Sequence, residues 1–106
     1  MEITAQFEHY LLHTKRVSSK TLRNYRSDLK HFMEWSKKHI ENAGAVIISP
    51  HHLISHISPS LIGKYKGFHL EAGVPRATLN RRLSTLRNFS RFLAELGLKT
   101  EDPTEI

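Results

Sequence analysis

The stretch from Val74 to Gly97 is the feature that most limits what this chain can fold into. At about 100° per residue, six apolar side chains of this stretch fall on one side of a helix. They are Leu79, Leu83, Leu86, Phe89, Leu93 and Leu96. Pro75 suits a first helical turn, where its missing N–H has no intrahelical partner, and Gly97 can adopt the left-handed conformation that ends a helix. We therefore expect one amphipathic helix here, with its apolar side in the core.

The other side of this helix is basic and carries no acidic residue before Glu95. Its polar residues are Arg76, Asn80, Ser84, Arg87, Asn88 and Arg91. Long cations alternate with short polar side chains, which would let the helix backbone come close to a partner. Such a face suits an anionic surface.

The same spacing predicts three further helices. The first is expected over roughly residues 2–14, and the second from a cap at Ser18 or Ser19 to about His39. A third should begin at Ser58, which is followed by a first-turn proline, and end near Gly73. Residues 41–58 are expected to form a loop, with room for a short helix at 50–56. The expected fold class is all-α, a compact bundle of four main helices.

The second helix repeats the two-sided pattern. Its apolar stripe contains Leu22, Tyr25, Leu29, Phe32 and Met33. Its outward side holds Lys20, Arg23, Asn24, Ser27, Lys30 and His31. We expect this side and the basic side of residues 75–97 to form one continuous surface.

Most aromatic side chains lie at helical core spacing and are expected to pack instead of stacking on bases. They are Phe7, Tyr25, Phe32, Phe68, Phe89 and Phe92. Trp35 lies at the edge of the apolar side of its helix, which leaves both interpretations open.

Charge points toward nucleic acid without deciding the matter. The chain has 16 Lys and Arg against 10 Asp and Glu, a net charge of +6. Eight basic and two acidic residues lie between Lys15 and Lys38, and five basic and no acidic residues between Ala72 and Ala94. Clustering of this kind is typical of nucleic-acid binders, although proteins that bind nothing can also be basic.

Composition excludes several classes of protein. The chain has no cysteine, which excludes disulfides, cysteine-based zinc fingers and thiol catalysis, and it fits a cytoplasmic setting. An apolar run long enough to span a membrane is missing, and Met1 leads into a polar stretch, so we expect neither a membrane partner nor a signal peptide.

Histidine pairs raise the question of a metal site. His9 and His13, and also His52 and His56, have the i, i+4 spacing that can place two imidazoles on one metal. Neither pair has a clear third ligand, and a closed structural site generally needs four, so we expect surface or packing histidines. Because the sequence has neither a glycine-rich phosphate loop nor a GxSxG motif, we expect no catalytic residue, no metal and no cofactor.

Two segments, residues 18–36 and 77–98, resemble the N-terminal core-binding domain of the tyrosine recombinases, also called the phage integrase family. The family pattern in the earlier helix is a Ser/Thr-rich start followed by a Tyr and an Asp-Leu pair, and in the later helix an Arg-Arg-Leu-Ser-x-Leu-Arg run. The matching positions are Ser19, Thr21, Tyr25, Asp28 and Leu29, then Arg81, Arg82, Leu83, Ser84, Leu86 and Arg87. Residues 41–58 are the main departure from the family.

The resemblance implies a SAM-like bundle, residues 1–98, that lays helices on double-stranded DNA as one half of a clamp. Residues 99–106 look like the start of the linker to a catalytic domain. The family's catalytic Arg, Lys, His and Tyr belong to that other domain, so this chain alone is expected to be no enzyme. Its implied partners are DNA, the catalytic domain of the same parent chain and other recombinase protomers. His13 and Arg16 match a bare H-x-x-R, which we interpret as a coincidence.

The expected DNA-binding residues divide into two roles. Phosphates would be held by Lys20, Arg23, Lys30, Arg76 and Arg91, with Thr21 and Thr78 near helix N-termini that attract anions. Base edges would be read by Asn80, Ser84, Arg87 and Asn88. Asn24, Ser27 and Arg81 complete the expected surface. The alternative is a helical protein-interaction module whose basic face meets an acidic partner.

Overall fold

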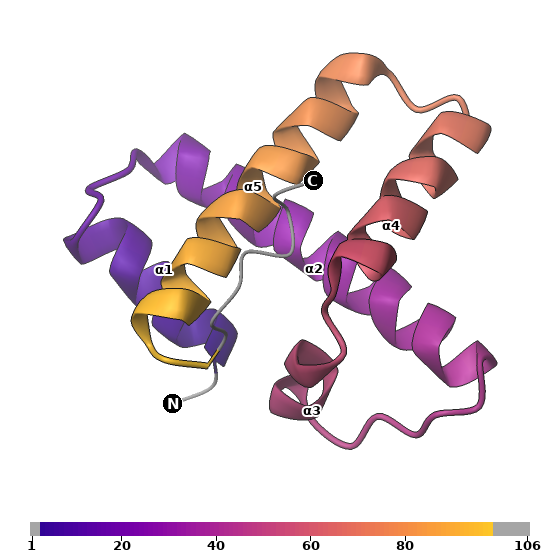
Figure 1. Ribbon diagram of the computed structural model, residues 1–106. Helices are drawn as coiled ribbons and strands as arrows, with labels where there is room; N and C mark the ends of the chain where they lie inside the picture. Colours follow the sequence, from indigo (N-terminus) through magenta and orange to yellow (C-terminus); the bar gives the residue numbers. More distant parts are fainter. Residues whose placement is uncertain (1–2, 99–106) are drawn as a thin grey trace.

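The structure is a computed structural model that describes residues 3–98, and within that range the chain is helical without strands (Figure 1). The elements are α1 (Ile3–His13), α2 (Ser19–Asn42), α3 (Pro50–Ser55), α4 (Pro59–Glu71) and α5 (Arg76–Glu95). The all-α prediction is confirmed. The four main helices are present, and the segment expected to be a loop contains the short helix α3.

Local chemistry explains where the helices begin. Ser18 caps α2, because its side chain accepts the main-chain N–H of Thr21 at 3.1 Å. Ser58 caps α4 in the same way through the N–H of Leu61, also at 3.1 Å. A side-chain oxygen at this position satisfies one of the N–H groups that a helix start leaves without an intrahelical partner.

The ends of α4 and α5 also follow from the sequence, with one correction. Gly73 and Gly97 have φ values of 70° and 75°, a left-handed conformation that suits glycine and stops a helix. Pro75, expected in the first turn of the last helix, instead precedes that turn as the N-cap of α5. Its ψ of 141° is extended, so the helical conformation starts one residue later, at Arg76.

Helix α2 is the centre of the molecule. Its 24 residues, about 36 Å at ~1.5 Å per residue, contact α1, α3, α4 and α5. In Figure 1, α4 and α5 lie in front of α2, and α1 folds back beside its first half. This arrangement buries one side of α2 and leaves the other to solvent.

Aromatic rings fill the core on both halves of α2. Phe7 of α1 lies 5.1 Å from Phe89 and 5.4 Å from Phe92 of α5, measured between ring centroids. Near the other end, Tyr65 of α4 lies 5.0 Å from both Phe32 and Trp35 of α2. The expected packing role of these aromatic residues is confirmed, and Trp35 is half-buried against the core.

Two residues expected in the core are exposed. Leu96 is 45% exposed. It is the C-cap residue that follows the last turn of α5, at the end of the apolar stripe. Phe68 is 41% exposed, although its ring centroid lies 6.0 Å from that of Trp35. Helical periodicity placed both side chains on the correct side of their helices but could not show where the covering element ends.

Candidate nucleic-acid interface

The residues expected to bind DNA all lie on α2 and α5. Ten of them are exposed: Lys20, Arg23, Ser27, Lys30, Arg76, Asn80, Arg81, Ser84, Arg87 and Arg91. The other four are half-buried: Thr21, Asn24, Thr78 and Asn88. Because none is buried, every one of these side chains can reach the surface. We call this set the α2/α5 face.

Side-chain hydrogen bonds join the two helices that carry this face. The guanidinium of Arg81 donates to the carboxylate of Asp28 through Nη2 at 2.7 Å and Nε at 3.1 Å. The amide Nδ2 of Asn88 donates to the hydroxyl of Tyr25 at 3.1 Å. A later residue of α5 thus pairs with an earlier residue of α2, so the helices run in roughly opposite directions where they cross. These contacts pack α5 against α2, and one continuous surface formed by their exposed sides stays a prediction.

Five cations of the α2/α5 face have no ion pair with any residue in the described range 3–98. They are Lys20, Arg23, Arg76, Arg87 and Arg91. The Nζ of Lys30 lies 4.0 Å from Oε1 of Glu34. Both side chains are mostly exposed, so this ion pair is weak. The face therefore keeps most of its positive charge available.

Three of the expected DNA-binding residues form hydrogen bonds within the domain, which leaves fewer of their donors and acceptors available to DNA. Both amide hydrogens of Asn88 are engaged, one by Tyr25 and one by the main-chain oxygen of Ser84 at 3.0 Å. The hydroxyl of Thr21 accepts a hydrogen bond from Ser18 at 3.0 Å. Arg81 is paired with Asp28, unlike the five free cations.

The family model for the phage integrase N-terminal SAM-like domain matches residues 4–97. The chain belongs to this family. Tyrosine recombinase XerC of Chlorobaculum tepidum is 26% identical over 106 residues, and tyrosine recombinase XerD of Oceanobacillus iheyensis is 26% identical over 98 residues. These alignments cover 95% and 92% of this chain, but 29% and 30% of the two relatives. No solved structure matches the chain.

The resemblance of residues 18–36 and 77–98 to the tyrosine recombinases is thus confirmed. The SAM-like domain spans less than a third of the length of these two relatives. The linker expected at 99–106 lies outside the described residues.

Sequence reasoning missed that Asp28 is buried between α2 and α5 of this SAM-like domain. Asp28 is 2% exposed and also accepts the hydroxyl of Thr85 at 2.9 Å. A signal was present in the helical spacing, because Asp28 lies on the flank of the apolar stripe, three residues after Tyr25 and four before Phe32. A carboxylate at such a place needs partners, and α5 supplies them.

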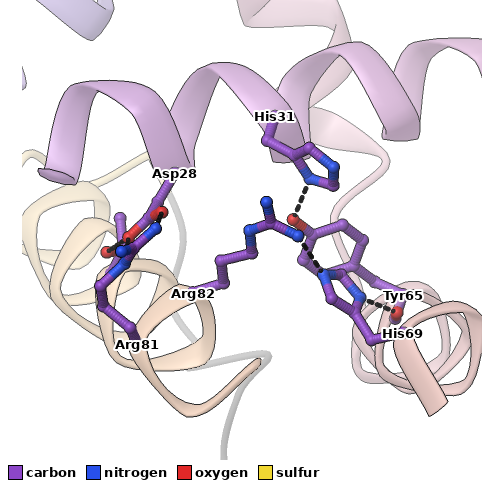
Figure 2. A network of polar contacts seen from close by, with 7 residues as sticks. Asp28, His31, Tyr65, His69, Arg81 and Arg82 are labelled. Carbon is purple, nitrogen blue, oxygen red and sulfur yellow. Dashed lines mark hydrogen bonds and ion pairs between the residues drawn. The ribbon is translucent and has the colours of Figure 1, made fainter. Parts of the chain in front are cut away.

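A second polar network joins α2, α4 and α5, and Figure 2 shows both networks. His69 of α4 is fully buried; its Nδ1 lies 2.7 Å from the main-chain oxygen of Tyr65 and its Nε2 lies 2.9 Å from Nη1 of Arg82. Because a carbonyl oxygen only accepts, Nδ1 carries the hydrogen and Nε2 accepts from Arg82.

His31 was expected on the outward side of its helix, but its side chain is not fully open to solvent. It is half-buried, and its Nδ1 lies 2.7 Å from the hydroxyl of Tyr65. Burial, followed by the nearby charge of Arg82, lowers the pKa of His31 below its usual value. Burial also raises the pKa of the Tyr65 hydroxyl. The network fastens α4 to the edge of α2, where helical spacing alone indicated an open surface.

Each histidine pair brings two imidazole rings close together. The rings of His9 and His13 lie 4.2 Å apart, and those of His52 and His56 lie 5.2 Å apart. In the part of the chain that the structure describes, no three His, Asp or Glu side chains are grouped to hold a metal. None of the helices in that part could span a membrane.

Proposed function

We propose that this chain is the DNA-binding N-terminal domain of a tyrosine site-specific recombinase of the phage integrase type. It would hold the recombination site for a separate catalytic domain of the same parent chain, next to other protomers on the DNA. Membership of the SAM-like family and the names of the two relatives support this proposal. The chain itself would bind DNA without cutting it.

The observation that carries the proposal is the charge of the α2/α5 face. Its five unpaired cations come from two helices joined by the Asp28–Arg81 contact. Exposed cations without internal acidic partners keep their attraction for phosphates, and the release of counterions from DNA then drives binding. A face that served only solubility would not need to exclude acidic residues along most of α5.

The two roles within the face follow from side-chain length and position. The cations Lys20, Arg23, Lys30, Arg76 and Arg91 would position the duplex through its phosphates. The first turn of α5, which includes Thr78, lacks a side-chain cap and leaves its N–H groups available to a phosphate. Asn80, Ser84 and Arg87, with the remaining acceptor of Asn88, would face base edges.

A titration with fluorescent duplex DNA at low salt tests the proposal. The isolated domain should bind weakly, with a Kd of roughly 10⁻⁴ to 10⁻⁶ M, because half of a clamp makes few contacts. A parallel titration with polyglutamate tests the alternative, a module for an acidic protein partner. Binding to polyglutamate but not to DNA would reject the proposed function.

A further inference from the structure

Arg81 differs from the other cations of the α2/α5 face because a buried acid holds it. Its partner Asp28 has a side chain only 1% exposed, whereas the side chain of Arg81 is 48% exposed. Asp28 is itself held by the hydroxyl of Thr85, which donates to Oδ2 at 2.9 Å. One edge of the guanidinium is therefore held by Asp28 (Figure 2), while about half of the side chain remains exposed to solvent.

The outer edge of the Arg81 guanidinium keeps N–H donors that Asp28 does not use. A guanidinium has five N–H donors in a planar fork, and Asp28 takes one from Nε and one from Nη2. Three remain, two on Nη1 and one on Nη2. One N–H from each of these nitrogens points along the outer edge, side by side. This pair of donors matches two adjacent acceptors, such as O6 and N7 of guanine.

The surroundings of Arg81 favour a base over a phosphate. Its exposed neighbours on the same side of α5 are small, with Ala77 one turn before it and Ser84 three residues after it. Its charge is partly balanced by Asp28, which weakens attraction for a phosphate but leaves the direction of the remaining N–H groups unchanged. The unpaired cations of the face are better suited to phosphates, where charge matters more than direction.

We infer that Arg81 reads a guanine in the major groove through its outer guanidinium edge, and that Asp28 is the positioning residue that holds this edge in place. The inference rests on the proposed DNA-binding function. The inference gives the Asp28–Arg81 ion pair a role in binding. Asp28 orders the Arg81 side chain before DNA binds, so less side-chain entropy is lost when the complex forms.

The test uses a duplex selected from a randomised library by the wild-type chain. Each guanine of that duplex is replaced in turn by 7-deazaguanine, which lacks the N7 acceptor, and affinity is measured by fluorescence anisotropy. For the wild type, one replacement should cost severalfold in affinity. In Arg81→Lys that cost should disappear, because the single ammonium of lysine can pair with Asp28 but does not offer a second pair of parallel N–H donors to guanine. Asp28→Asn should reduce it, because the amide holds the guanidinium less firmly.

Arg26→Lys is the matched control. Arg26 pairs with Glu8 through the same two nitrogens, Nε at 2.6 Å and Nη2 at 3.3 Å, but its partner belongs to α1 and it is not among the expected DNA-binding residues. This variant should keep the full cost of 7-deazaguanine. Thermal denaturation checks that each variant is folded. If Asp28→Asn does not fold, Arg81→Lys with its control still decides the question, because Arg81 is largely exposed.

The outcomes separate this inference from the proposed function. Arg81→Lys retaining the full guanine cost, or losing affinity equally on all duplexes, would overturn the assignment to a base. A wild type that binds DNA without preferring any guanine would overturn it as well, while leaving the proposed function intact. A wild type that binds no duplex at low salt would reject both.

Discussion

At the scale of single residues, neighbours in the chain have opposite environments. Leu86 is 2% exposed and belongs to the core, whereas Arg87, the next residue, is exposed on the α2/α5 face. An α-helix turns by about 100° per residue, so adjacent side chains can serve stability and binding separately. Substitutions at these two positions should therefore have different effects.

Arg87→Ala should leave the domain folded and weaken binding to a preferred duplex by about 1–3 kcal/mol. Leu86→Ala should lower the free energy of unfolding by about 2–5 kcal/mol, because it leaves a cavity in the core. Urea denaturation and DNA titration of both variants measure the two effects. If Arg87→Ala destabilised the fold as much as Leu86→Ala, the assignment of the α5 surface would be wrong.

His31 should make stability depend on pH. Its folded-state pKa is lowered mainly by burial, so as the pH falls the unfolded chain takes up a proton first, near its ordinary pKa of about 6.5. The contribution of His31 to stability should be complete above that pH and decline as the pH falls toward the lower folded-state pKa. Arg82 and His69 add to the shift, and Asp28 and Glu34 oppose it.

Urea midpoints measured between about pH 7.5 and 5.5 test this dependence. His31→Gln should make stability less sensitive to pH in this range, because glutamine can still accept from the Tyr65 hydroxyl but does not titrate. His9→Gln, on the exposed side of α1, is the matched control. An equal change in both variants would show that the effect does not arise at the junction of α2 and α4.

At the scale of elements, α2 and α5 each combine a core side and a basic side. Asp28 and Arg81 connect the two helices, and we expect their basic sides to present a single surface to DNA. Cations spread over two joined helices can contact phosphates that are far apart along the duplex. The number of these contacts is measurable from the salt dependence of binding.

If about four to six phosphates are neutralised, the log of the association constant should fall against log salt with a slope of roughly −4 to −5. Lys20→Ala or Arg91→Ala should weaken binding to all sequences alike and reduce the size of this slope by about one. Lys64→Ala is the control, because Lys64 is an exposed cation on α4, outside the two helices that carry the α2/α5 face. A slope unchanged by the Lys20 and Arg91 substitutions would remove both residues from the phosphate contacts.

At the scale of the whole molecule, the helices are arranged around α2 so that the tyrosine side chains are used in packing. Tyr65 is fully buried, and its hydroxyl contacts His31. Tyr25 accepts a hydrogen bond from Asn88, and Tyr10 is half-buried against Phe92 at 5.1 Å between ring centroids. Tyr65 has a base, His31, within hydrogen-bond reach, but its side chain is fully buried and cannot approach a phosphate. The hydroxyl of Tyr25 contacts an amide of α5, not a base.

The chain alone should therefore neither cut nor join DNA, because a nucleophile must reach the phosphate and also have an activating group within hydrogen-bond reach. Incubation with supercoiled plasmid, followed by gel electrophoresis, should show neither relaxation nor a covalent protein–DNA adduct. An adduct through Tyr10, Tyr25 or Tyr65 would contradict this interpretation of the chain.

The sequence by itself determined the helices and the side that each turns to the core. Caps such as Ser18 and Ser58 and stops such as Gly73 and Gly97 act within a few residues, so local chemistry sets most helix boundaries. Helical periodicity then separates the buried Leu86 from the exposed Arg87. The same local information placed the expected DNA-binding residues on α2 and α5.

Only the tertiary structure decided which polar side chains meet. Arg81 and Arg87 look alike in the sequence. Arg81 pairs with the buried Asp28, which lies 53 positions earlier in the chain, whereas Arg87 has no ion pair within the described residues. The same holds for His31, which was expected in solvent and is instead bonded to Tyr65 of α4. Periodicity describes a helix relative to its own axis and contains no information on which neighbour packs against each flank. That choice depends on how all the helices pack around α2, and it determines which cations remain available.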